Sequence, residues 1–240
     1  MKTYKELLAT THDNIVGRED IEWSNCWYDR SNTENSKRIL LIGDSTARII
    51  RSTFSKMVNR PVDLFAHSGG LHDIIFVKQL EAFFSSDHYK YSTIFVQLGH
   101  HSQWNEDGIE YSDCDYIRYR DDLCSLVLYL RQYCSNIVLL SIFLDVEPPK
   151  SKMVPSFITS IIRSICGENY NLKVNEIKRK KNNIIYEVSQ RFNLPYCDIN
   201  RYMEQINSCK ILKFVHYDHI HFERKSYNTI VKHYMEYLND

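Results

Sequence analysis

The sequence predicts an α/β fold built on a parallel sheet. Short apolar runs of strand length alternate with longer segments in which apolar residues recur at helical spacing. This alternation is typical of a parallel sheet covered by helices on both faces. The chain has 240 residues, enough for one domain with a full core, and only 7 Gly and 5 Pro, which argues against disordered stretches.

Five apolar runs are the predicted strands, and a predicted helix follows each one. The strands are residues 38–43, 61–66, 92–98, 136–143 and 194–199. The helices are residues 46–59, 71–85, 116–134, 171–192 and 223–238. In the third helix Leu123, Leu126, Val127 and Leu130 form one apolar face.

Two segments lie outside this alternation. Residues 1–36 contain Trp23 and Trp27, and we expect them to form an N-terminal arm packed on the domain of residues 37–240. Residues 145–169 form an insertion with an apolar helical stripe. That stripe predicts either a helix docked on the core or a lid, because this connection leaves the edge of the sheet where ligands bind.

Composition limits the classes of partner. Thirty basic residues balance thirty acidic residues, so nothing indicates a nucleic-acid partner. No stretch approaches the roughly 18 apolar residues of a membrane span, and the N-terminus does not resemble a signal peptide. The seven Cys are scattered without a Cys-x-x-Cys pair, which predicts reduced thiols and a cytoplasmic location.

Residues suited to acyl transfer stand near the two ends of the chain. The first predicted strand ends at Gly43 and is followed by Asp44 and Ser45. A strand-to-helix turn of this kind presents a Ser hydroxyl at the carboxyl edge of the sheet, although Ser45 could instead only cap the helix. Asp218 precedes His221 by three residues, close enough to hold its ring in one tautomer. A nucleophile, a base and an orienting carboxylate are therefore present.

Four sequence blocks in this order resemble the SGNH (GDSL-like) hydrolase superfamily, from about Lys37 to the C-terminus. The blocks are Gly43-Asp44-Ser45, Gly69-Gly70, Val96-Gln97-Leu98-Gly99-His100-His101 and Asp218-His219-Ile220-His221. The third block departs from the family's usual Gly-x-Asn-Asp, and His101 matches the His of a Gly-Leu-His-Asp form found in a subset of relatives. The resemblance implies a three-layer α/β/α sandwich with a five-stranded parallel sheet in the flavodoxin-like order 2-1-3-4-5.

The resemblance also implies residue roles. Ser45 would be the nucleophile, His221 the base and Asp218 its orienting partner. The oxyanion hole would consist of the N–H groups of Ser45 and Gly70 (or Gly69) and the side chain of His101. A neutral imidazole can donate one N–H, which makes this donor sensitive to pH. The alternative is that His101 only fills space in a weak or inactive relative.

Further residues are candidates for the pocket around this site. They are Asp44, Arg48, Gly69, His72, His100 and His219, with His67 and Asp73 bordering the second block. Arg48 would meet an acidic substrate group or remain a solvated or salt-bridged helix residue. A metal site at His216, His219 and His221 is disfavoured by their spacing and by the lack of a further ligand motif.

These observations predict serine-dependent acyl-ester chemistry, either hydrolysis or transfer, and the resemblance implies O-acetyl groups of a carbohydrate as its substrate. Hydrolysis would need no cofactor, whereas a transferase would use a donor such as acetyl-CoA. The basic run from Lys178 to Lys181 predicts a solvated helix face, with a phosphate contact as the alternative. The competing function is a non-catalytic protein that binds a carbohydrate or a partner. The sequence does not indicate an oligomeric state.

Overall fold

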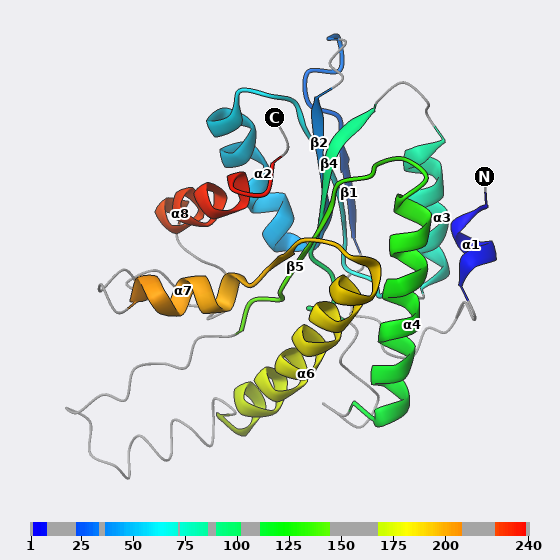
Figure 1. Ribbon diagram of the computed structural model, residues 1–240, viewed down its shortest axis with the longest axis vertical. Coiled ribbons are helices and arrows are strands. Elements are labelled where there is room, and N and C mark those ends of the chain that lie inside the picture. Colours follow the sequence, from blue (N-terminus) through cyan, green and yellow to red (C-terminus); the bar gives the residue numbers. More distant parts are fainter. Residues whose placement is uncertain are drawn as a thin grey trace.

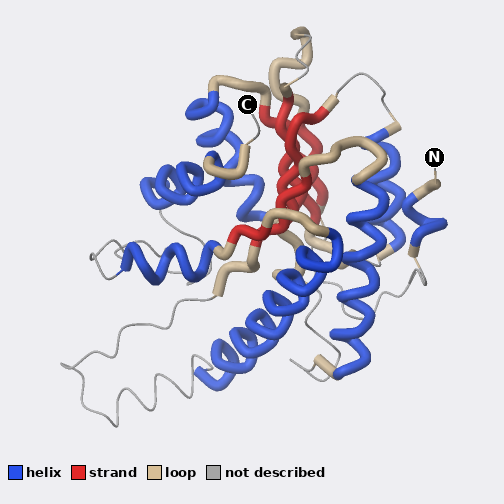
Figure 2. The backbone as a smooth tube through the Cα atoms, in the orientation of Figure 1, coloured by secondary structure: helices blue, strands red, loops and turns tan. Residues whose placement is uncertain are grey.

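The protein forms one six-stranded sheet with helices on both faces (Figures 1 and 2). The structure is a computed structural model and describes residues 2–8, 23–33, 37–71, 73–85, 90–101, 111–144, 168–207 and 224–238. The strand order is β1-β3-β2-β4-β5-β6. The predicted α/β class is therefore confirmed.

Five of the strands are parallel and correspond to the five predicted runs. They are β2 (Arg38–Gly43), β3 (Val62–His67), β4 (Tyr91–Val96), β5 (Ile137–Leu140) and β6 (Tyr196–Cys197). Counted among themselves, these strands have the order 2-1-3-4-5, as expected. Their carboxyl ends therefore meet at one edge of the sheet.

The sixth strand comes from the N-terminal segment and makes the sheet mixed. β1 (Ser24–Trp27) pairs antiparallel with β3, with Ser24 opposite His67 and Trp27 opposite Leu64. Its four residues, Ser-Asn-Cys-Trp, show no alternation of apolar and polar side chains, so the sequence pattern does not reveal it.

The helices divide between the two faces of the sheet (Figure 1). On one face lie α2 (Ser45–Val58), α7 (Ile199–Asn207) and α8 (Arg224–Met235). On the other lie α1 (Tyr4–Leu7), α3 (Ile74–Phe84), α4 (Asp113–Leu130) and α6 (Glu168–Phe192). All five predicted helices occur with bounds shifted by a few residues, whereas the short helices α1 and α7 are additional.

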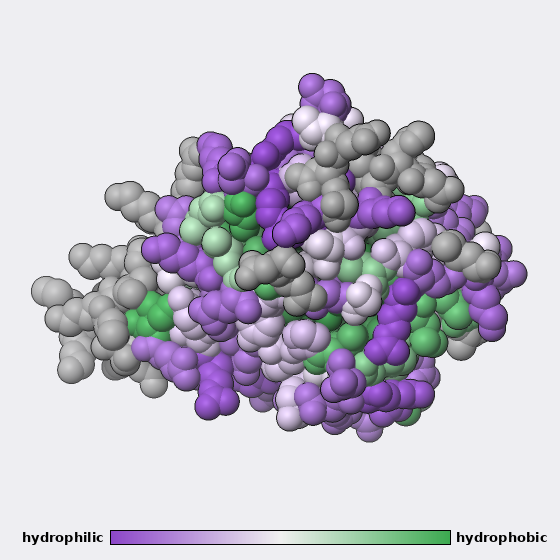
Figure 3. Space-filling model, turned by 45° about the horizontal axis from the view of Figure 1, so that its top comes forward, coloured by the Kyte–Doolittle hydropathy of each residue, from purple (hydrophilic) through white to green (hydrophobic). Residues whose placement is uncertain are grey.

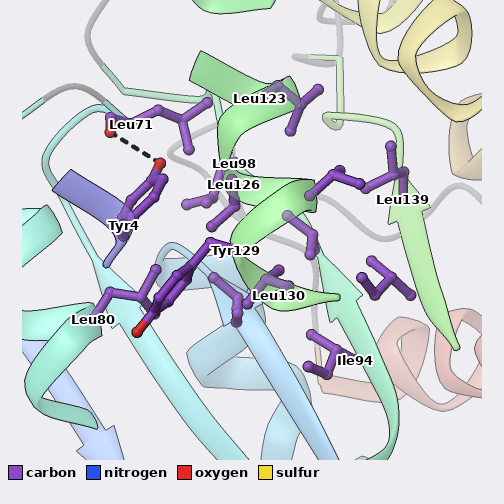
Figure 4. Packing of buried hydrophobic residues seen from close by; sticks show 14 of the residues in the cluster. Tyr4, Leu71, Leu80, Ile94, Leu98, Leu123, Leu126, Tyr129, Leu130 and Leu139 are labelled. Atoms are coloured by element: carbon purple, nitrogen blue, oxygen red, sulfur yellow. Dashed lines mark hydrogen bonds between the residues drawn. The ribbon is translucent and has the colours of Figure 1, made fainter. Parts of the chain in front are cut away.

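Alternating side chains of the central strand feed two separate apolar cores. Leu40 and Ile42 of β2 join the core under α3 and α4, and Ile39 and Leu41 join the core under α2 and α8. Figure 4 shows the first of these cores, where the Tyr4 hydroxyl donates to the Leu71 carbonyl at 3.2 Å. Burying a side chain of this size contributes about 1.5–3 kcal/mol, so the two cores hold the sheet between its helix layers.

A buried polar network ties the strands together at their amino ends. Arg38 of β2 and Asp63 of β3 form an ion pair with both side chains fully buried, and the Arg38 Nε donates to Asp63 at 2.9 Å. The Tyr91 hydroxyl of β4 donates to the same carboxylate at 3.1 Å, and the backbone N–H of Asp29, which follows β1, donates to it at 2.8 Å. One carboxylate thus connects four neighbouring chain segments.

Polar residues cover much of the surface around these cores. Figure 3 shows one face on which hydrophilic residues cover most of the area, with smaller apolar patches between them. None of the described helices is both long and apolar enough to cross a lipid bilayer. Residues 145–167 of the predicted insertion lie outside the described residues, so the docked helix or lid expected there stays a prediction.

Candidate functional site

Three chain segments and Trp23, the residue just before β1, meet at the carboxyl edge of the sheet. The segments follow β2, β3 and β4, which are hydrogen-bonded neighbours in the sheet. Each of the first three sequence blocks falls on one of these segments. This is the edge where open α/β sheets bind ligands.

Ser45 is the first residue of α2 and lies directly past the end of β2. Asp44 is the helix N-cap, because its buried carboxylate accepts from the Thr46 N–H at 2.8 Å. Asp44 therefore caps this helix, so helix capping does not explain the presence of Ser45. The positive end of the α2 dipole favours negative charge next to Ser45.

Gly43 allows the tight approach that precedes Ser45. A Cβ atom at this position would lie 2.6 Å from the Ala47 Cβ and 2.9 Å from the Gln97 carbonyl oxygen. Contacts this short do not occur for real side chains, so only glycine permits β2 to turn into α2 against β4. The Gly-Asp-Ser order thus has a packing reason in addition to a chemical one.

The segment after β3 is held by its own side chains. The Gly69 N–H donates to the Nδ1 of buried His67 at 2.6 Å, which leaves the proton of a neutral His67 ring on Nε2. Asp73 is the N-cap of α3 and accepts from the Ile75 N–H at 2.7 Å, while its own N–H donates to the Gly70 carbonyl at 3.0 Å. The Gly69 N–H is therefore engaged within this loop.

The segment after β4 carries the two histidines of the third block. The Leu98 carbonyl accepts from the Tyr119 hydroxyl at 2.6 Å, and Gly99 has a φ of 122°, which favours glycine. His100 is buried and His101 is half-buried, with their ring centroids 6.1 Å apart. The strand ends at Val96, two residues earlier than predicted.

A buried lysine supports this histidine segment, although the basic run around it predicts exposed side chains. The Lys181 Nζ donates to the Gly99 carbonyl at 2.9 Å and lies 4.4 Å from the ring centroid of Tyr111 and 5.3 Å from that of Tyr119. Lys178 and Lys181 are each only 1% exposed, so the solvated face predicted for this basic run is wrong for these two residues. Burial, reinforced by the nearby charge of Lys178, lowers the pKa of Lys181 to about 7.

The spacing of α6 carried a signal for this burial. Its buried positions recur at helical intervals, and both lysines fall among them. These positions are Val174, Asn175, Ile177, Lys178, Lys181, Asn182, Ile185, Val188 and Ser189. The basic residues between them, Arg179 and Lys180, are exposed.

Trp23 joins the site from the N-terminal segment. Its backbone N–H donates to the Ser68 Oγ at 2.9 Å, and its carbonyl accepts from the Ser68 N–H at 3.1 Å. Its ring lies edge-on to His101 with centroids 6.4 Å apart, and the Arg48 guanidinium lies 5.0 Å from the Trp23 ring centroid. Trp23 thus links the histidine segment to the first turns of α2, and Arg48 packs on this ring.

The structure describes only part of the predicted site. It places Ser45, Gly70 and His101 on the three segments at the carboxyl edge, with Asp44 and Gly69 in local hydrogen bonds. Asp218, His219, His221 and His72 lie outside the described residues. Among the residues that are described, no group of His, Cys, Asp and Glu side chains is arranged to hold a metal ion.

Several solved structures share this fold. Axe2, an acetylxylan esterase from Geobacillus stearothermophilus, is 12% identical with a TM-score of 0.52, covering 86% of this chain and 95% of its own. LAE5, an alpha/beta hydrolase from the metagenome of Lake Arreo in Spain, is 13% identical with a TM-score of 0.56, covering 87% and 99%. The acetyl xylan esterase AlAXEase is 9% identical with a TM-score of 0.56, covering 83% and 98%.

The Axe2 structures include two catalytic mutants, in which a serine and a histidine, respectively, are replaced by alanine. No protein-family model and no curated protein sequence matches this chain. At identities this low, the structural likeness establishes a shared α/β fold.

Proposed function

We propose that the protein is a serine-dependent acyl-ester hydrolase of the SGNH type. The observation that carries the proposal is the position of Ser45 in a strand-turn-helix whose capping is already performed by Asp44. The fold shared with two acetylxylan esterases supports the proposal. The Axe2 structures also support it, because the catalytic mutants of that protein replace a serine and a histidine.

The residues present are sufficient for acyl transfer. The Ser45 Oγ would attack the ester carbonyl while His221, oriented by Asp218, takes its proton; His221 would then give that proton to the alcohol, which leaves as the ester C–O bond breaks. Water, deprotonated in turn by His221, would attack the acyl-serine and release the carboxylic acid and free Ser45. For this, the His221 Nε2 must come within about 2.6–3.2 Å of the Ser45 Oγ.

The developing oxygen anion requires donors aimed at it. The Ser45 N–H at the start of α2 is one, and a glycine of the second block is another. Because the Gly69 N–H donates to His67, Gly70 is the better choice. The His101 ring is the third proposed donor.

We propose an O-acetylated carbohydrate as the substrate, since Axe2 and AlAXEase are esterases of acetylated xylan. Hydrolysis requires no cofactor. Transfer to a sugar hydroxyl would use the same acyl-serine and a donor such as acetyl-CoA. An ester panel assayed with and without hydroxyl acceptors separates the two reactions.

A second candidate function is a non-catalytic protein that binds a carbohydrate or a partner. His101 favours it, because this residue replaces the amide of the family's usual oxyanion donor. A protein of this class would bind the same acetylated sugars without turning them over.

The direct test replaces Ser45 by alanine. We expect Ser45→Ala to reduce hydrolysis of 4-nitrophenyl acetate and of acetylated xylooligosaccharides by several orders of magnitude, the usual loss for a triad member. Ser52→Ala, on the same helix and also half-buried, is the matched control and should retain full activity. Equal activity of Ser45→Ala and the wild type would end the serine-hydrolase proposal.

A further inference from the structure

A cavity of about 560 Å³ lies beside the edge strand β6, among residues of α6, α7 and α8. Its volume is in the range of small-molecule sites. Neither the sequence blocks nor the proposed catalysis uses any residue that lines it.

Aromatic rings from three helices and the edge strand surround this cavity. Tyr186 of α6 is 50% exposed and packs edge-on against Tyr196 of β6, with ring centroids 5.4 Å apart. Tyr202 of α7 stacks on His233 of α8 at 3.9 Å with the rings nearly parallel, and Tyr237 follows α8. Rings fixed by neighbouring rings offer flat apolar surfaces at little cost in side-chain entropy.

The phenols are neutral hydrogen-bonding groups. Burial raises the pKa of Tyr202, and it raises that of Tyr237 to about 12, so both keep their protons at physiological pH. Tyr196 is shifted in the same direction by burial. The lining thus combines apolar ring faces with hydroxyls that both donate and accept.

The remaining polar groups at the rim are planar. Exposed Asn183 and Gln205 each carry an amide, and exposed Arg201 carries a guanidinium. Asp198 also lines the cavity, and its carboxylate accepts from the Arg201 backbone N–H at 3.1 Å at the start of α7. These side chains add hydrogen-bond donors and acceptors to the lining.

This chemistry suits an uncharged sugar better than an anion or an apolar ligand. A sugar ring presents C–H groups on its faces and hydroxyls around its edge, which match tyrosine faces and planar polar groups. An anion would favour a helix N-terminus, but at α7 that position is occupied by the Asp198 carboxylate. The Glu236 carboxylate lies 3.1 Å from the His233 Nδ1 and adds negative charge beside this ring.

The cavity lies beside the outermost strand of the sheet, at a lateral distance from Ser45. Ser45 follows β2, and β6 lies beyond β4 and β5; neighbouring strands are about 4.8 Å apart, so the lateral separation is roughly 14 Å. The Tyr237 carbonyl accepts from the Asn136 side chain just before β5, so Tyr237 lies near the amino ends of the strands, whereas Asp198 directly follows the carboxyl end of β6.

We propose that this cavity is a second carbohydrate-binding site, which holds one unit of a neutral glycan apart from the Ser45 site. The inference of a sugar site depends only on the residues that line the cavity. The identification of the bound chain as an acetylated polymer rests on the proposed function. A polymer held at both places would bind more tightly than at either alone, provided that it spans them.

The test measures binding without catalysis. Unacetylated hexaoses of xylose, glucose and mannose are titrated by calorimetry into Ser45→Ala and into Ser45→Ala carrying Tyr186→Ala or Arg201→Ala. At least one hexaose should bind, and either rim substitution should weaken it roughly three- to tenfold. Trp27→Ala is the matched control, because Trp27 is also 50% exposed but lies on β1, and it should leave the affinity unchanged.

Three outcomes would contradict the proposed sugar site. They are that no hexaose binds, that the variants with a rim substitution bind the hexaose as tightly as Ser45→Ala does, or that Trp27→Ala lowers the affinity by the same factor. A protein that binds through this cavity but shows no esterase activity would contradict the proposed function and leave the sugar site standing. An active esterase that binds no hexaose would support the proposed function and contradict the sugar site.

Discussion

His101 is the residue at which this chain departs from the family it resembles. It lies past the end of β4, and Trp23 packs against its ring. If its ring donates to the oxyanion, His101→Ala should lower the hydrolysis rate by about 10²–10³, the typical loss for one such donor. His101→Asn should recover part of that rate by supplying an amide N–H. Steady-state kinetics on one ester substrate gives both values.

Thermal unfolding of the same variants provides the control. Because the His101 side chain is only half-buried, neither substitution should change the unfolding temperature much. An alanine variant with undiminished turnover would show that His101 does not act on the reacting oxygen.

Lys181 gives the folded protein a distinctive dependence on pH. Its pKa is about 7 when folded, against roughly 10.4 for an unperturbed lysine. Between these values the unfolded chain binds more protons, so the free energy of unfolding should rise with pH by up to about 1.4 kcal/mol per pH unit. Below about pH 7 Lys181 is protonated in both the folded and the unfolded protein. The folded protein then bears the full cost of burying the charge, and this lysine adds no further dependence on pH.

Urea unfolding between pH 7 and 9 tests this effect. Lys181→Met should flatten the rise in stability, because the titrating amine is gone. Lys180→Met is the control: Lys180 neighbours Lys181 in the sequence but is exposed, so this variant should keep the wild-type slope. Parallel slopes in all three proteins would mean that Lys181 stays charged in the fold.

Strand pairing at the amino ends of β2, β3 and β4 depends on one buried carboxylate. Asp63→Ala would leave the Arg38 charge buried without its ion-pair partner and should destabilise the protein by about 3–5 kcal/mol. Chemical denaturation checks this value. Asp121→Ala removes one member of an exposed pair with Arg120 and should cost no more than about 1 kcal/mol. Similar losses in the two variants would contradict the role assigned to the buried network.

The predictable elements were those whose burial leaves a local pattern. β2 to β5 are fully or largely buried, so they appear in the sequence as apolar runs. β1 leaves no such pattern, because its place is set by antiparallel pairing with β3 at the edge of the sheet. α7 escaped prediction because it is short and directly follows the two-residue strand β6.

The predictability of the candidate site has the same physical basis. The Gly43-Asp44-Ser45 turn could be predicted because a strand, a glycine and a helix start are adjacent in the sequence. Trp23 could not, because it reaches Ser68 and His101 only through the tertiary pairing of β1. Lys181 was misassigned because a basic run outweighed the helical spacing that places it among buried residues.

The arrangement of the sheet puts Ser45, Gly70 and His101 on neighbouring segments at its carboxyl edge, and the proposed chemistry depends on an activated Ser45. Labelling with a fluorophosphonate probe, followed by peptide mass spectrometry, reads that activation without any assumption about substrate. We expect one adduct, on Ser45, that is lost in Ser45→Ala and strongly reduced in His221→Ala. An intact protein that takes up no probe, or takes it up on another residue, would contradict it.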